Sequence, residues 1–157
     1  MPWGDLVAGL REAGWSNLSN ASAVLRLGRS DVAVAFRGVD DPHIERDRYD
    51  DVAGPFPSEA AVRIGVAHAP YLRILDAMAA DGADVILAGH THGGQVCLPG
   101  GRAIVTNCDL DPARASGLSH HHGAYLHVSP GLGTAPSAPI RLFCPPRAVV
   151  LTLVGKP

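Results

Sequence analysis

The sequence has 157 residues, of which 46% are hydrophobic and 18% are charged, and this balance excludes a disordered chain. Its formal net charge is −2 and its basic residues are scattered, so no nucleic-acid partner is expected. No transmembrane segment is expected, because the apolar stretches are shorter than the ~20 residues that cross a bilayer. No signal peptide is expected either, because the N-terminus has acidic residues and lacks a charged segment followed by an apolar one.

The first predicted element is a short helix over residues 5–13. Its apolar side chains recur on one face, and Gly14 follows as a left-handed stop. Trp3 and Trp15 flank this segment, and we expect them to pack the helix against the rest of the protein.

Two alternating apolar runs come next, over residues 23–27 and 32–36. The turn-forming sequence Gly28-Arg29-Ser30-Asp31 separates them, which predicts a β-hairpin. Residues 40–57 are then polar and rich in Asp, Arg, Pro and Gly, as is typical of a long surface loop.

A βαβ unit is predicted in the middle of the chain. Residues 63–67 and 84–88 are short apolar strands, and residues 70–80 between them have a helical pattern that ends at Gly82. Such a unit has parallel strands and a right-handed crossover, so the fold class is α/β. Further β-like segments are expected at residues 103–106, 124–129, 140–143 and 148–154.

Histidines follow both strands of this unit. His68 comes after the first strand, and His90 and His92 come after the second, within Gly-His-Thr-His-Gly-Gly. The carboxyl ends of parallel strands emerge at the same edge of a sheet, where ligands bind in open α/β folds. We therefore expect the three imidazoles to converge there as ligands of Zn²⁺, Mn²⁺ or Fe.

The alternative is that these are ordinary polar loop histidines. For His68 alone that interpretation is preferred. For the pair it is not, because a buried strand, the i, i+2 alternation and three neighbouring glycines coincide at His90 and His92.

Several segments resemble the calcineurin-like metallophosphoesterases, and in particular a bacterial branch of that family. They are Val66-Ala67-His68-Ala69-Pro70, Gly89-His90-Thr91-His92-Gly93-Gly94-Gln95, Leu98-Pro99-Gly100, Ser129-Pro130-Gly131-Leu132-Gly133-Thr134, Pro139-Ile140-Arg141 and Cys144-Pro145-Pro146. The resemblance implies a four-layer α/β/β/α sandwich of two mixed sheets with outer helices. It also implies hydrolysis of phosphate mono- or diesters, with a small-molecule or lipid-linked substrate.

The same resemblance implies a role for each histidine. His68 and His90 would share one divalent metal ion (Mn, Fe or Zn), and His92 would bind a second. Two such ions about 3.5–4 Å apart bridge a hydroxide and clamp the phosphate for in-line attack. The nucleophile would then be metal-bound water, so no side-chain nucleophile is required.

The carboxylate motifs that the family places in its first half have no counterpart here. We therefore interpret residues 1–157 as the C-terminal part of a metallophosphoesterase domain, and expect one weakly bound metal at most in the isolated chain. The chain would be a truncated gene product, the result of a mis-started reading frame, or a fragment that pairs with a complementary N-terminal segment. A non-catalytic remnant and a single-zinc hydrolase with three histidines are the alternatives.

Three other groups are interpreted as structural. Asp40, Asp41 and His43 are assigned to a turn before a proline rather than to a ligand group. The run at residues 120–122 is assigned to a solvated loop. The cysteines at positions 97, 108 and 144 lack metal-binding spacing and are expected to be reduced, partly buried thiols of a cytoplasmic protein.

Overall fold

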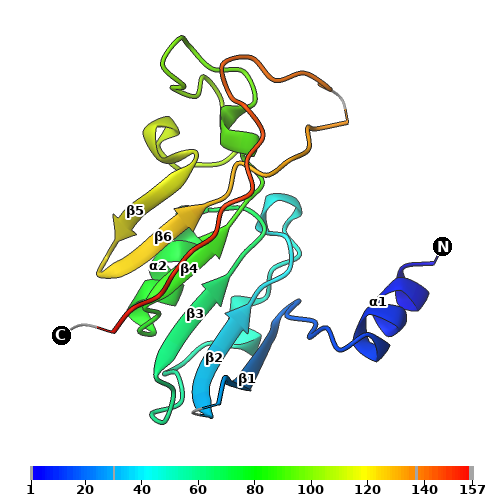
Figure 1. Cartoon of the computed structure of the whole chain (residues 1–157), viewed down its shortest axis with the longest axis vertical. Helices are drawn as coiled ribbons and strands as arrows, with labels where there is room; N and C mark the ends of the chain where they lie inside the picture. Colours follow the sequence, from blue (N-terminus) through cyan, green and yellow to red (C-terminus); the bar gives the residue numbers. More distant parts are fainter. Residues whose placement is uncertain (1, 30, 137, 156–157) are drawn as a thin grey trace.

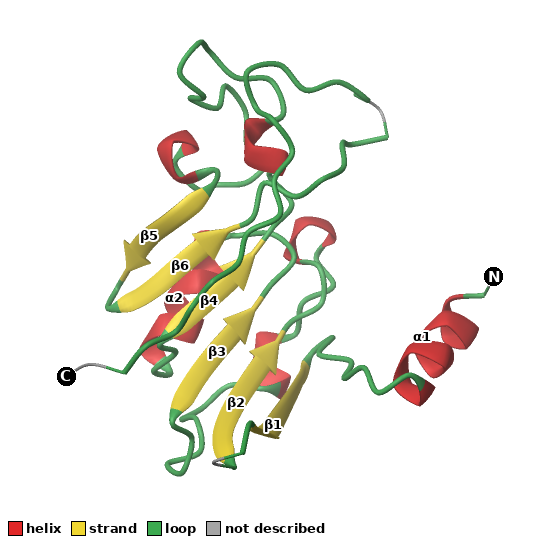
Figure 2. Cartoon of the chain, viewed as in Figure 1, coloured by secondary structure: helices red, strands yellow, loops and turns green. Residues whose placement is uncertain are grey.

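The computed structural model describes residues 2–29, 31–136 and 138–155 of the chain. They form one six-stranded mixed sheet, in the order β1-β2-β3-β4-β6-β5 (Figure 1). The strands are β1 (Ala21–Leu27), β2 (Val32–Gly38), β3 (Val62–Val66), β4 (Val85–Ala88), β5 (Gly117–His121) and β6 (Ala124–Val128). The helices are α1 (Trp3–Glu12) and α2 (Leu72–Ala80), shown in red in Figure 2 together with short 3₁₀ turns. The α/β class is confirmed.

The centre of the sheet is parallel. Strands β2, β3, β4 and β6 run in one direction, and β1 and β5 pair antiparallel at the two edges. The unit β3–α2–β4 is the predicted βαβ unit. Consequently the loops that follow β2, β3, β4 and β6 all leave the same edge of the sheet, at the upper end in Figure 1.

The core lies between α2 and the sheet. Ile74, Leu75 and Met78 on the inner face of α2 are almost fully buried, as are Ile86 and Leu126 on the strands. Burial of each such side chain contributes about 1.5–3 kcal/mol. This packing holds α2 against the sheet, next to β4, whose end carries two of the histidines.

A polar cluster joins the end of α2 to the loop after β2. The carboxylate of Asp81 accepts hydrogen bonds from Arg37 Nη1 at 2.7 Å, from the Tyr49 hydroxyl at 2.7 Å and from the Gly54 amide at 2.8 Å. The guanidinium of Arg37 also stacks 4.2 Å from the ring centroid of Phe56. Burial raises the pKa of Tyr49 to about 12, so its hydroxyl stays protonated and donates.

The hairpin β1–β2 is confirmed, although its turn includes Ser30, which lies outside the described residues. Three predicted strands are wrong. Residues 140–143 contribute a single bridge between Leu142 and Val96, and residues 148–154 form an extended segment with no strand partner among the described residues. Residues 103–106 likewise contribute only a bridge, between Ala103 and Cys97.

Helix α1 is confirmed, but its expected packing is wrong. Trp3 and Trp15 are 74% and 67% exposed, and none of the residues of α1 is buried. In Figure 1 the helix stands apart from the sheet, beyond β1. Neither helix among the described residues is long and apolar enough to span a membrane.

Candidate metal centre at the carboxyl edge of the sheet

The three histidines lie where the parallel sheet predicts. His68 follows β3, and His90 and His92 follow β4, so all three leave the same edge. We call these three residues the histidine edge. The main chain of His90 has a left-handed conformation, which turns it out of the β4 direction.

His68 and His90 meet directly. Nε2 of His68 lies 3.3 Å from Nδ1 of His90, and the two rings are 5.1 Å apart in an edge-on arrangement. Two nitrogens bound to one tetrahedral cation at 2.0–2.1 Å are themselves about 3.3 Å apart. The pair therefore already has the separation that a shared metal ion requires.

A backbone carbonyl fixes the orientation of His90. Its Nε2 lies 3.2 Å from the carbonyl oxygen of Asn107. Because a carbonyl only accepts hydrogen bonds, Nε2 carries the proton and Nδ1 presents its lone pair toward His68. Metal-bound histidines are commonly held in this way by a second hydrogen bond.

His92 is held by different neighbours. A hydrogen bond to the Gly133 carbonyl orients its ring, and the His92 carbonyl accepts from Arg141 Nη1 at 3.1 Å. His92 has no hydrogen bond or ring contact with His68 or His90 in the described part of the chain, although the charge of His68 acts on it. The histidine edge thus consists of one pair in contact, His68 and His90, and a third residue, His92, that does not contact them.

The pKa values favour the neutral, metal-binding form of these rings. Burial lowers the pKa of His90 most, and the charges of His43 and His68 lower it further. Burial also lowers the pKa of His92, followed by the positive charge of Arg141. Neutral imidazole has the lone pair that a cation needs.

Both histidines of the pair after β4 have a strained backbone. The φ angle of His90 is 65° and that of His92 is 49°. A left-handed conformation costs about 1–2 kcal/mol in a residue with a side chain, and such strain concentrates at functional sites. The same loop is closely packed at Gly94, where an added Cβ would clash with Cβ of Ala103.

A segment from far along the sequence covers this loop. The side-chain amide of Gln95 donates to the Ala138 carbonyl at 2.6 Å and accepts from the Ala135 amide at 2.7 Å. The guanidinium of Arg141 binds the carbonyl oxygens of Pro130 and His92. These contacts hold the Gly-Leu-Gly-Thr segment beside His92.

Asp41 and His43 also reach the histidine edge. Their predicted turn is confirmed, since Asp41 Oδ1 accepts from the His43 amide at 2.9 Å and caps a 3₁₀ turn. However, Asp41 Oδ2 lies 3.9 Å from Nε2 of His68, and the His43 ring lies 4.4 Å from the His90 ring. The signal that could have found them is their position after β2, which is parallel to β3 and ends at the same edge.

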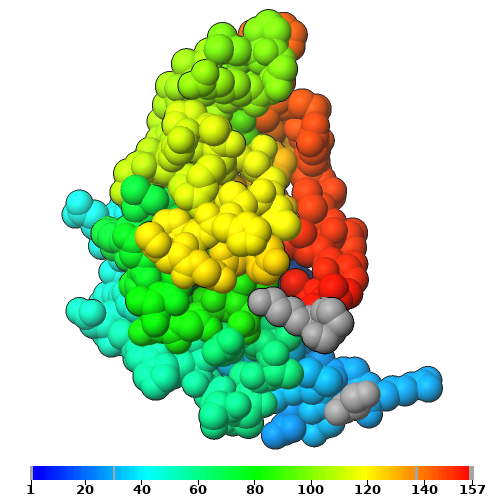
Figure 3. Space-filling model, turned by 90° about the vertical axis from the view of Figure 1, so that its left-hand side faces the viewer, coloured from blue at the N-terminus to red at the C-terminus, as the bar shows by residue number. Residues whose placement is uncertain are grey.

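A second group of metal-type side chains lies at the opposite end of the sheet. Asp76 of α2, His121 at the end of β5 and His122 in the next turn place one ligand atom each within 4.8 Å of one another. The prediction of a solvated loop is wrong for His120 and His121, which belong to β5. His121 is also buried and 2.7 Å from Asp76. In Figure 3 the yellow surface of β5 lies against the green surface of α2.

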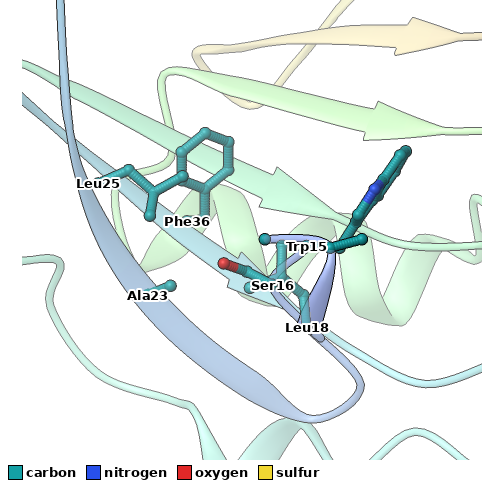
Figure 4. A pocket seen from close by; sticks show the side chains of 8 residues that line it. Trp15, Ser16, Leu18, Ala23, Leu25 and Phe36 are labelled. Carbon is teal, nitrogen blue, oxygen red and sulfur yellow. The ribbon is translucent and has the colours of Figure 1, made fainter. Parts of the chain in front are cut away.

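A hollow of about 330 Å³ lies away from both groups. It is bounded by the segment after α1 and by the exposed side of β1 and β2, including Trp15, Leu25 and Phe36 (Figure 4). Its lining is mostly apolar and has no metal-type side chains. The candidate metal ligands described above therefore lie at the sheet ends and not in this hollow.

Comparison with known proteins gives partial similarities. The chain is 30% identical over 167 aligned residues to the uncharacterized protein YpbG of Bacillus subtilis, and the match covers 98% of the chain and 57% of the relative. It is 36% identical over 74 residues to an uncharacterized metallophosphoesterase of Aquifex aeolicus, covering 46% of the chain and 26% of that protein. The chain thus spans less than two thirds of either relative. No protein-family model matches it, and no solved structure does.

Proposed function

We propose that the histidine edge belongs to a metal-dependent phosphoesterase, with His68 and His90 on one divalent cation and His92 on a second. The observation that carries this proposal is the 3.3 Å separation of the two facing nitrogens, one of which presents a fixed lone pair. The partial similarity to a metallophosphoesterase supports the reaction class. The substrates would be phosphate mono- or diesters, and the cations Mn²⁺, Fe or Zn²⁺.

The residues present fit such a centre in chemistry. Imidazole nitrogens suit borderline transition metals, and Asp41 adds a carboxylate near His68. When bound, two such ions supply a hydroxide and stabilise the charge that develops on the phosphate. The chain itself orients the ligands, through the carbonyls of Asn107 and Gly133, and leaves His68 on the open side.

Charge balance indicates that further ligands are needed. Neutral imidazoles cannot hold two dications at short range, and such pairs require bridging carboxylates. We propose that residues 1–157 form the C-terminal part of a four-layer domain, and that a complementary segment provides those carboxylates. That segment would correspond to the part of the relatives that the chain does not span.

Metal titration tests the proposal. The background carries Asp76→Asn and His122→Ala, so that only the histidine edge remains, and Mn²⁺ or Zn²⁺ is titrated calorimetrically. We expect one ion of low affinity, with affinity reduced at least about tenfold by His90→Ala. His120→Ala is the matched control, because His120 is exposed and lies outside both groups. Unchanged affinity in the His90→Ala chain would refute the assignment.

Activity distinguishes the two-metal enzyme from its alternatives. The two-metal proposal expects hydrolysis of a chromogenic phosphodiester with Mn²⁺ only when a complementary segment is supplied. Turnover by the chain alone that is lost in His92→Ala would instead identify a single-metal hydrolase. Metal binding without turnover, even with the added segment, would identify a non-catalytic metal-binding domain. This alternative is favoured by one observation: among the described residues, Asp41 is the one carboxylate seen beside His68.

A further inference from the structure

The cluster of Asp76, His121 and His122 is separate from the histidine edge. Strand β6 is parallel to β4, and its last residue pairs with the last residue of β4. The β5–β6 turn that carries His122 is therefore at the amino end of β6, and His90 is at the opposite end. The cluster and the histidine edge can therefore be tested independently of each other.

We propose that these three side chains form a second binding site, for a borderline transition-metal cation such as Zn²⁺. The spacing supports it, because Asp76 Oδ1 lies 2.7 Å from His121 Nε2 and 3.4 Å from His122 Nε2. Ligand atoms around a tetrahedral zinc ion are about 3.3 Å apart. All three donor atoms lie within 4.8 Å of one another, so only small side-chain shifts are needed to bring them onto one ion.

The donor types select the class of cation. Two imidazole nitrogens and one carboxylate oxygen suit Zn²⁺, Co²⁺, Ni²⁺ or Cu²⁺, whereas Mg²⁺ and Ca²⁺ prefer oxygen ligands throughout. The carboxylate also offsets part of the positive charge of the ion. The site is open on one side, since Asp76 and His122 are exposed, so a water molecule could complete the coordination.

The backbone presents these ligands from three fixed directions. Residues 121–124 form a tight hairpin turn, in which His122 and Gly123 have φ angles of 47° and 92°. Positive φ at both central positions is the mark of the turn that matches the twist of antiparallel strands. Asp76 comes from the middle of α2, so a bound cation would link this helix to the hairpin.

Arg114 lies beside His121 and should weaken metal binding at this site, so its replacement provides a second test. Its Nη1 lies 3.4 Å from Nδ1 of His121, while its other nitrogens bind Ser119 and the His120 carbonyl. An arginine only donates, so Nδ1 accepts and Nε2 donates to Asp76 in the metal-free protein. A cation on Nε2 would move the proton to Nδ1, facing the guanidinium. Replacement of Arg114 should therefore tighten metal binding.

The experiment is a Zn²⁺ titration of the full chain that carries His68→Ala and His90→Ala. Binding is measured by calorimetry and by NMR of the imidazole nitrogens. We expect one ion per chain, with the nitrogen signals of His121 and His122 shifted. His122→Ala and Asp76→Asn should each weaken binding about tenfold or more. His120→Ala should leave it unchanged, Arg114→Ala should tighten it, and Mg²⁺ should not compete.

Two results would overturn the site. One is no Zn²⁺ binding in that background, which would leave the cluster as a metal-free ion pair between α2 and the hairpin. The other is equal affinity in His122→Ala, whose exposed side chain can be removed without disturbing the core. Neither result bears on the histidine edge, because two of its three residues are replaced in the test protein.

Discussion

The two carboxylate oxygens of Asp41 serve different neighbours. One caps the 3₁₀ turn through the His43 amide, and the other faces His68. Asparagine would keep an oxygen that caps the turn but would lose the negative charge that faces His68. The substitution Asp41→Asn therefore separates capping of the turn from the electrostatic effect on His68. The sequence alone indicates only the capping of the turn, because the approach of Asp41 to His68 depends on which strands are neighbours.

We therefore predict that Asp41→Asn weakens Mn²⁺ or Zn²⁺ binding at the histidine edge without a large loss of stability. The expected decrease in affinity is about tenfold, since a charged neighbour of a metal ligand is removed. Calorimetric titration gives the affinity, and urea unfolding in the absence of metal gives the stability. An equal affinity in both proteins would show that Asp41 has the capping task alone.

The buried side chain of His127 should make the free energy of unfolding depend on pH. Burial lowers the pKa of its ring below the usual value near 6.5. The unfolded chain then binds more protons than the folded chain below about pH 6.5, so the free energy of unfolding falls as the pH falls. We predict that His127→Gln reduces this loss between pH 7.5 and pH 5, measured by urea unfolding. His120→Gln, at an exposed position, should leave the profile of the parent protein unchanged.

At the scale of elements, the loop after β4 depends on close packing more than on glycine flexibility. Gly94 and Gly100 have nearly the same φ angles, 91° and 97°. An added Cβ at Gly94 would meet the backbone of Ala103 at 2.8 Å, whereas at Gly100 nothing lies within 4 Å. The two positions thus carry the same conformational cost and differ in the space around them.

We predict that Gly94→Ala destabilises the protein more than Gly100→Ala, by about 1–3 kcal/mol of overpacking. It should also weaken metal binding, because the strained backbone of His92 is two residues away. Urea unfolding and metal titration of the two variants provide the comparison. Equal free energies of unfolding would show that Ala103 yields without cost.

The junction between α2 and the loop after β2 depends on one carboxylate. We predict that Asp81→Asn lowers the free energy of unfolding by about 3 kcal/mol, because Arg37 would remain buried without its counter-charge. Asp31→Asn is the control, since the Arg26–Asp31 pair is exposed on both sides and should contribute less than about 1 kcal/mol. Chemical denaturation measures both, and similar losses in the two variants would contradict the prediction.

At the scale of the whole molecule, the central part of the fold follows from local sequence signals. The apolar runs of β3 and β4 and the helical period of α2 predict the βαβ unit, and with it the meeting of His68 and His90. Strand β5 could not be predicted this way. Its sequence, Gly-Leu-Ser-His-His, has no apolar alternation, and it is a strand because β6 offers an edge to pair with.

The opposite error occurs in the last third of the chain. Residues 148–154 have the composition of a strand, yet no strand edge pairs with them among the described residues. Strand formation depends on a partner as well as on propensity, and partners are not visible in a short window of sequence. For the same reason, the local sequence of Asp41 and His43 predicts a turn and not their approach to the histidine edge.

The exposed position of α1 determines what an optical probe of this protein would report. The chain has two tryptophans, one at the start of this helix and one just after its end, and both are largely in solvent. Their fluorescence in the native protein should already resemble that of free indole in water, and melting of the sheet should change it little. A shift of the emission to shorter wavelength would instead signal that the helix has docked onto another surface.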